Sequence, residues 1–189
     1  MRAIPGRFVV FLLFAVLLSG LVTAAMSSRA EPSRVTVPVG DKGMTPTKRA
    51  EALGIKFEKL EPGYLNRCVK SGKLLFTSGH TSKIKGRLGK DLDVETGKKA
   101  AREAAVEVLK AVWNTHGTLD NLRVVKVLGC VNSSPKFYDQ PKVINACSDL
   151  LHEIFGAKTD GWHARSALGF AALPNGCAVE IEAIFEIKD

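Results

Sequence analysis

Residues 91–187 alternate between segments of helical and of strand periodicity, and this alternation constrains the fold more than any other feature of the sequence. Apolar residues recur every three or four positions over 101–112 and 144–155, which predicts two amphipathic helices. Three other segments are rich in Val or alternate apolar with polar residues, which predicts strands over 122–131, 164–171 and 178–187. Helices and strands in this order are expected to pack as layers around one apolar core.

Both predicted helices have residues at their ends that favour starting or stopping a helix. Asp93 is the candidate N-cap of the first helix, and Gly117 ends it. Pro135 and Pro141 frame the start of the second helix, and Gly156 ends it. The two helices are therefore predicted to be separate elements that are joined through a strand.

Two short apolar runs around Ser71 and Gly72 predict a β-hairpin over 68–79, ahead of the first helix. The predicted order is β-β-α-β-α-β-β, an α+β fold with both helices on one face of the sheet. We expect this single domain to occupy residues 50–189.

Residues 1–30 have the pattern of a secretory signal peptide. Arg2 and Arg7 precede the apolar stretch 8–25, and small residues follow it. The protein is therefore predicted to be exported to the periplasm or secreted, with no stable membrane anchor after cleavage. The alternative is an N-terminal membrane anchor that is not cleaved, although the stretch is just short of the roughly 20 residues of a spanning helix. Residues 31–49 contain Pro and Gly at intervals and are predicted to be an extended linker.

Composition excludes several classes of protein. The chain is 46% hydrophobic and 24% charged, which is typical of a globular protein and not of collagen, a coiled coil or a disordered chain. Its formal net charge is +8, and Arg2, Arg7 and Arg29 in the predicted signal peptide contribute three of those charges. Because solvated surfaces commonly carry such an excess, we expect no nucleic-acid partner.

The cysteines and histidines show no metal-binding spacing. The four Cys and the four His are scattered along the chain, without a Cys-x-x-Cys or a His-x-x-x-His pair. A metal site is therefore not predicted. If the protein is exported, one disulfide is an open alternative, and four Cys allow three pairings between which the sequence does not choose.

The last predicted strand places carboxylates on one of its faces. Glu180, Glu182 and Glu186 alternate with apolar residues over 178–187, so the apolar face is expected to pack against the helices. A row of carboxylates would then lie on the opposite face of the sheet.

The preceding strand has a mixed pattern. Leu168 and Phe170 share one face, and Arg165, Ala167 and Gly169 share the other. We expect the face with Leu168 and Phe170 to pack against the helices, which would put Arg165 on the same side as the carboxylates.

An arginine beside small residues suits recognition of a small carboxylate. The guanidinium offers five N–H donors in one plane, and Ala167 and Gly169 leave room for a ligand. A nearby carboxylate such as Glu180 is able to hold or deprotonate a water molecule. The alternative is an open sheet face on which ordinary Arg–Glu pairs meet solvent.

The segment 163–184 resembles the C-terminal signature of the RidA (YjgF-like) family. It contains Ala-Arg-Ser-Ala-Leu-Gly-Phe-Ala-Ala-Leu-Pro and then Val-Glu-Ile-Glu-Ala, and the family pattern is roughly Ala-Arg-Ser-x-Val-x-Val-Ala-x-Leu-Pro followed by Val-Glu-Ile-Glu-Ala. Residues 72–79, Gly-Lys-Leu-Leu-Phe-Thr-Ser-Gly, are similar to the family's second-strand motif. The resemblance covers about residues 60–187.

This resemblance implies a chorismate-mutase-like α+β fold and a homotrimer with ligand clefts between subunits. It also implies a hydrolase without a cofactor, which converts reactive enamine and imine (2-imino acid) intermediates to 2-oxo acids and ammonia. The expected partners are therefore a small imino or 2-oxo acid and two further copies of the chain.

The resemblance also implies roles for particular residues. Arg165 would bind the substrate carboxylate, Glu180 would position the attacking water, and Ser78 and Gly79 would line the cleft. The family's cleft tyrosine has an approximate match in Tyr64, which lies one residue early relative to the Gly72 motif.

Two positions depart from the family pattern. A family asparagine on the second helix aligns with Ser148, while Asn145 lies about one turn earlier. The cysteine often found two residues after the family arginine is Ala167 here. The carboxylate-binding and water-positioning residues are present, so these departures bear on the shape of the substrate.

Two other functions stay open at this point. A non-catalytic trimer that binds a small acid would use Arg165 but not Glu180. An RNA-binding or ribonuclease role, attributed to some relatives, has less support. The basic loop 83–90 contains Gly86-x-x-Gly89 but no aromatic residues, and a solvated turn is the simpler interpretation.

Overall fold

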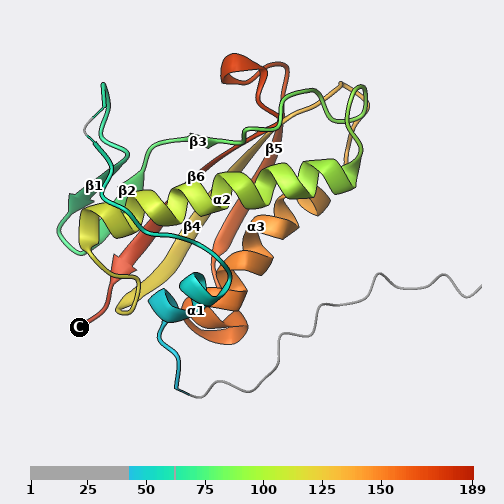
Figure 1. The fold of residues 1–189 in the computed structure, drawn as a ribbon. Helices are drawn as coiled ribbons and strands as arrows, with labels where there is room; N and C mark the ends of the chain where they lie inside the picture. The colour runs from blue at the N-terminus through green and yellow to red at the C-terminus, as the bar shows by residue number, and fades with distance from the viewer. Residues whose placement is uncertain (1–42, 62) are drawn as a thin grey trace, which may run out of the picture. The chain divides into compact units, whose positions relative to one another are not determined.

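The computed structural model describes residues 43–61 and 63–189, which form one sheet covered on one face by helices (Figure 1). The strands pair in the order β1-β2-β6-β4-β5, and the short β3 pairs with β6 beyond the end of β2. Of the strand pairs in the described residues, only β4 and β5 run parallel. The strands are β1 (Cys68–Ser71), β2 (Leu74–Thr77), β3 (His80–Thr81), β4 (Leu122–Asn132), β5 (Ala164–Phe170) and β6 (Val179–Ile187). The helices are α1 (Pro46–Ala52), α2 (Val94–His116) and α3 (Gln140–Phe155).

The predicted fold class is confirmed, and the predicted strands and two long helices occur in the expected order, to which the structure adds the short α1 and β3. The cap residues of α2 are those that the sequence indicated. The Asp93 side chain accepts a hydrogen bond from the backbone N–H of Thr96 at 2.8 Å. Gly117 ends α2 with a φ of 88°, a conformation that residues with a Cβ rarely adopt. Gly156 likewise ends α3 and leads into a π-helical turn, η1 (Gly156–Asp160).

The core lies between the sheet and the two long helices. The Ala-rich stripe of α2 is fully buried, which brings this helix close to the sheet (Figure 1). From β6, Ile181, Ala183 and Phe185 point into the core, while Glu180 and Glu182 alternate with them and point away. The predicted orientation of the last strand is therefore confirmed.

The orientation predicted for β5 is wrong. Arg165 pairs with Val127 of β4, which is fully buried under the helices, so Arg165 lies on the helix-covered face. Leu168 and Phe170 lie on the opposite face, with side chains that are 49% and 38% exposed. A strand at the edge of a sheet can turn apolar residues outward when another surface covers them, and the sequence pattern alone does not tell which face is covered.

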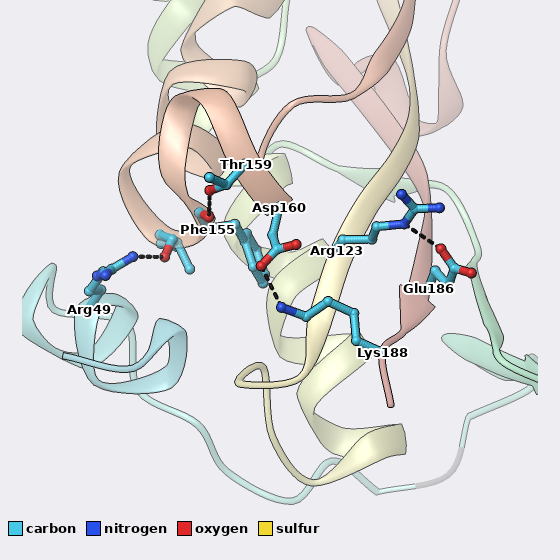
Figure 2. A network of polar contacts seen from close by, with 8 residues as sticks. Arg49, Arg123, Phe155, Thr159, Asp160, Glu186 and Lys188 are labelled. Carbon is cyan, nitrogen blue, oxygen red and sulfur yellow. Dashed lines mark hydrogen bonds and ion pairs between the residues drawn. The ribbon is translucent and has the colours of Figure 1, made fainter. Parts of the chain in front are cut away.

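The N-terminal boundary of the domain also differs from the prediction. Residues 46–49 belong to α1 rather than to an extended linker, because Thr45 caps a helix that has Pro46 in its first turn. The helix is anchored by Arg49, whose Nη1 donates to the carbonyl of Ile154 at 3.0 Å (Figure 2). The predicted signal peptide, and the predicted linker up to residue 42, lie outside the described residues. None of the described helices combines the length and the apolarity that crossing a bilayer requires.

The end of the sheet near the C-terminus is tied to η1 by polar contacts (Figure 2). Lys188 donates to the carboxylate of Asp160 at 2.5 Å, and Thr159 donates to the carbonyl of Phe155 at 3.1 Å. Arg123 of β4 and Glu186 of β6 form an ion pair on neighbouring strands. The contacts of Asp160 and Thr159 hold η1, from which the chain enters β5.

Candidate functional site

Arg165 lies between β5 and α3, where two polar side chains of the helix hold it. Its Nη1 donates to Oδ1 of Asn145 and to Oγ of Ser148, each at 3.0 Å. Asn145 and Ser148 are three residues apart on α3 and therefore lie on the same face of the helix. Both residues considered for the family's asparagine position thus contact the same arginine.

A histidine extends this group. Oγ of Ser148 lies 3.1 Å from Nε2 of His163, and Nδ1 of His163 lies 2.6 Å from the carbonyl oxygen of Gly161. Ser148 is buried, with 8% of its surface exposed. Asn145, Ser148, His163 and Arg165 are called the arginine cluster below.

Burial lowers the pKa of His163 below its ordinary value. The positive charge of Arg165 and the neighbouring His152 act in the same direction, while the hydrogen bond to Gly161 opposes them. His163 is therefore expected to be neutral at pH 7.

Glu180 belongs to a different group, on the open face of the sheet. A Cβ added to Gly79 would lie 2.8 Å from the carboxyl carbon of Glu180, so only a glycine permits this close approach. Burial raises the pKa of Glu180 above its usual range, and the Glu182 carboxylate on the same strand raises it further. A carboxylate with a raised pKa is a stronger base than an ordinary one.

A cavity of about 290 Å³ lies beside Gly79. Ser78, His80 and Arg67 line it, together with Glu107 from α2. Ser78 donates through Oγ to the carbonyl of Asn66 at 2.7 Å, and Nε2 of His80 donates to the carbonyl of Arg67 at 3.2 Å. Glu180 does not line this cavity, and Gly79 is the residue that joins the two. Gly79, Glu180 and the cavity residues are called the glutamate cluster below.

Tyr64 lies in the segment that leads into this cavity, but its side chain is fully exposed. Leu65 and Asn66, which follow it, line the cavity. Tyr64 is therefore a neighbour in sequence of residues that line the cavity, and no hydrogen bond among the described residues joins it to Arg165.

The two predicted catalytic side chains thus lie on opposite faces of the sheet, Arg165 on the helix-covered face and Glu180 on the open face. Arg165 is paired with Val127 of β4, and Glu180 is paired with Cys130. By ordinary strand geometry their Cα atoms are separated by about 10 Å across the sheet and about 10 Å along it. One small ligand is therefore too short to touch both side chains of a single chain.

Two histidines near Arg165, His163 and the neighbouring His152, were not predicted to belong to the site. Their rings lie 5.6 Å apart between centroids, and Trp162 stacks on His152 at 6.1 Å. The available signal was the spacing of Asn145, Ser148 and His152, which puts three polar side chains on one side of the helix.

The described part of the chain holds no group of three or more His, Cys, Asp or Glu side chains arranged for a metal ion. All four cysteines are free thiols. Burial raises the pKa of Cys130 to about 11 and that of Cys147 to about 12, so both are protonated at neutral pH.

The basic loop 83–90 is held to the domain by its own arginine. Nε of Arg87 donates to Oδ1 of Asn132 at 3.3 Å, and Nη2 donates to the carbonyl of Ala171. Arg87 is therefore engaged in contacts within the chain.

Comparisons with known proteins agree with the resemblance in the C-terminal signature. The family model for endoribonuclease L-PSP matches residues 59–187. The chain is similar to Protein TCP17 of Trypanosoma cruzi, with 42% identity over 128 residues that cover 64% of this chain and 79% of the relative.

Two solved structures have the same fold. A protein of unknown function from Agrobacterium tumefaciens is 34% identical with a TM-score of 0.68, and the match covers 76% of this chain and 94% of that one. A protein of Shewanella oneidensis MR-1 is 25% identical with a TM-score of 0.69, and the match covers 76% of this chain and all of that one. The chain belongs to the endoribonuclease L-PSP family, which is the RidA (YjgF-like) family.

Proposed function

We propose that this protein is a cofactor-independent deaminase that hydrolyses 2-imino acids to 2-oxo acids and ammonia. The observation that carries the proposal is the arginine cluster. Nη1 of Arg165 is held by two acceptors on α3, while among the described residues Nε and Nη2 donate to none. A guanidinium that is oriented in this way is prepared to bind a carboxylate through two parallel hydrogen bonds.

The water-positioning role falls to Glu180. Its carboxylate is partly withdrawn from solvent and its pKa is raised, so it is better suited than an ordinary carboxylate to accept a proton from water. The absence of a side chain at Gly79 lets this carboxylate pack directly against the backbone, which limits its movement.

The reaction then follows from these two groups. Arg165 binds the carboxylate of the 2-imino acid, and the water oxygen forms a bond to the C=N carbon while Glu180 takes a proton. The electron pair of the C=N bond moves to nitrogen, which is protonated, and the carbinolamine is formed. Its collapse breaks the C–N bond, releases ammonia and leaves the 2-oxo acid. Because imines hydrolyse spontaneously, holding water and imine together supplies much of the acceleration.

The separation of the two clusters supports an active site between copies of the chain. The open face of the sheet exposes large apolar side chains, and a partner surface is the ordinary reason for such a patch. They are Val69, Phe76, Leu168 and Phe170. We propose a homotrimer in which Arg165 of one copy and Glu180 of its neighbour face one cleft, and the number three comes from the family resemblance. Light scattering that gives the mass of a single chain would contradict this assembly.

One observation also favours a second candidate, a non-catalytic protein that binds a small acid. The arginine cluster is complete within one chain, and it does not need Glu180 to bind a carboxylate. This candidate predicts ligand binding without turnover.

The experiment that tests the proposal measures ammonia release from a panel of enzymatically generated 2-imino acids. Wild type is compared with Arg165→Ala and Glu180→Gln. Arg123→Ala and Glu186→Gln serve as matched controls, because they break an exposed ion pair elsewhere on the sheet. We expect turnover in wild type and both controls and a large loss in both site variants. Equal rates with wild type, Arg165→Ala and no protein would contradict the deaminase, and 2-oxo acid binding that needs Arg165 would then favour the second candidate.

A further inference from the structure

The hydrogen bonds of the arginine cluster run in a direction that the chemistry of the groups determines. A carbonyl oxygen only accepts, so Nδ1 of His163 carries the hydrogen that is donated to Gly161. In a neutral ring Nε2 is then an acceptor, and the hydroxyl of Ser148 donates to it. A guanidinium only donates, so the Ser148 oxygen accepts from Arg165.

We infer that His163 is a positioning residue that acts through the Ser148 hydroxyl to hold the Arg165 guanidinium in the orientation that binds a carboxylate, and that protonation of His163 releases this hold. The inference rests on the proposed carboxylate-binding role of Arg165. His163 itself touches no ligand, since Ser148 stands between it and the arginine.

Protonation of the His163 ring changes the arrangement, because the Ser148 hydroxyl has a single hydrogen to donate and Nε2 is the single nitrogen of the neutral ring that accepts it. A protonated His163 ring donates from Nε2, so the Ser148 hydroxyl hydrogen loses its acceptor. The imidazolium of His163 and the guanidinium of Arg165 then both donate to Oγ of Ser148. The imidazolium and the guanidinium also repel each other through this short connection. Arg165 is expected to lose a fixed orientation rather than its charge.

The surroundings of His163 favour the neutral ring. From α3, His152 lies beside it, and from β5, Arg165 adds a positive charge. From η1, the nearby carboxylate of Asp160 is engaged by Lys188. Burial lowers the pKa of the ring in the same sense, so the hold is in place at neutral pH and is lost as the pH falls below the lowered pKa of His163.

Two measurements test the inference. The first follows the ring nitrogens of His163 by ¹⁵N NMR without any ligand, and we expect a neutral ring protonated on Nδ1 at pH 8. In Ser148→Ala and in Arg165→Ala we expect the pKa of His163 to rise, because each variant removes a group that favours the neutral ring. The second titrates pyruvate, a 2-oxo acid of the product class, into the full protein at pH 8 and pH 5.

For wild type, pyruvate is expected to bind about tenfold more weakly at pH 5, as the loss of a charge-assisted hydrogen bond implies. His163→Gln offers Ser148 an amide acceptor that does not titrate, so its affinity is expected to stay near the wild-type value at both pH values. Ser148→Ala is expected to bind pyruvate weakly at both pH values. His116→Gln is the control, because His116 contacts Asn121 at the far end of α2. Thermal melts show that each variant is folded.

The outcomes separate a positioning role from a simple effect of charge. If the His163 ring acted only through its charge, wild type would bind pyruvate more tightly at pH 5 than at pH 8. That result would overturn the inference. Equal pH dependence in wild type and His163→Gln would also overturn it. If wild type binds pyruvate neither at pH 8 nor at pH 5, the proposed function fails. The positioning role of His163 is then tested by the ligand-free NMR spectra alone, and an unchanged pKa of His163 in Ser148→Ala would overturn it.

Discussion

The two clusters on this sheet differ in how completely one chain builds them. In the arginine cluster, helix α3 supplies two side chains, and the loop before β5 and strand β5 supply one each. Consecutive hydrogen bonds of 2.6–3.1 Å connect these side chains from Gly161 to Asn145. In the glutamate cluster, Glu180 approaches the backbone of Gly79 and has no hydrogen-bond partner among the described side chains. Arg165 is therefore held in place by side chains of its own chain, whereas Glu180 is held only by its packing against the Gly79 backbone.

This difference suggests a division of labour. A group that must orient a ligand benefits from a fixed geometry, whereas a base that must accept a proton benefits from few competing donors, because donors would lower its pKa. The opposite faces of one sheet suit these two requirements when neighbouring copies meet, since each copy then contributes its arginine side to one cleft and its glutamate side to another.

The largest expected effect comes from replacing the arginine. Arg165→Ala is expected to lower kcat/KM for an imino acid by at least about tenfold to a hundredfold, which corresponds to the loss of charge-assisted hydrogen bonds. Arg165→Lys should lose nearly as much, because one ammonium cannot contact Asn145 and Ser148 and also bind a carboxylate in two places. Steady-state kinetics with thermal melts check this. Near-wild-type turnover in Arg165→Lys would show that orientation is unimportant.

The second effect tests the glutamate cluster. Gly79→Ala is expected to reduce kcat strongly, because the added Cβ displaces the Glu180 carboxylate, while the melting temperature changes little. Gly63→Ala is the matched control, since its Cβ would make an ordinary 3.8 Å contact near the same cavity. If both variants keep the wild-type kcat, the approach of Glu180 to Gly79 has no part in turnover.

A smaller effect is expected from a neighbour of the base. Glu182 raises the pKa of Glu180, so Glu182→Gln is expected to lower that pKa and to shift the acidic limb of the kcat–pH profile to lower pH. Glu186→Gln, further along the same face, should leave the limb in place. A limb that moves in neither variant, or moves upward in Glu182→Gln, would argue against Glu180 as the base.

The smallest expected effect is on the pH dependence of the melting temperature. It is measured at one histidine from each cluster, His80 and His163. Burial lowers the pKa of both His80 and His163 in the folded protein. The unfolded chain therefore binds protons at a higher pH than the folded one, so stability falls as the pH drops below the ordinary histidine value. We expect the melting temperature to decrease between pH 7.5 and pH 5.5, and to decrease less in His80→Gln and in His163→Gln. An unchanged slope in both variants would contradict the two pKa directions.

Much of the fold could be predicted because its signals are local. The cap at Asp93, the stop at Gly117 and the alternation of β6 each depend on residues that are close in the sequence. Helix α1 was missed because its Pro and Gly neighbours are also typical of a linker.

The site was harder to predict because its contacts are not local. The face of β5 depends on which side the helices cover, and residues of both kinds occur on each side of that strand. The contact of Ser148 with His163 joins a helix to a loop across a turn, and no spacing rule encodes it. Types of residue could be identified from the sequence, but their grouping into two clusters required the fold.

The central claim is that one ligand is bound by Arg165 of one copy and Glu180 of another, and a mixture of two inactive variants tests it most directly. Arg165→Ala and Glu180→Gln are coexpressed in equal amounts, and native mass spectrometry confirms that they form mixed trimers. If sites lie between copies, each site has about a one-in-four chance of joining an intact Arg165 to an intact Glu180, so activity should return to about a quarter of wild type. Confirmed mixed trimers that remain as inactive as either variant alone would contradict the claim, because that result would require both residues from the same chain.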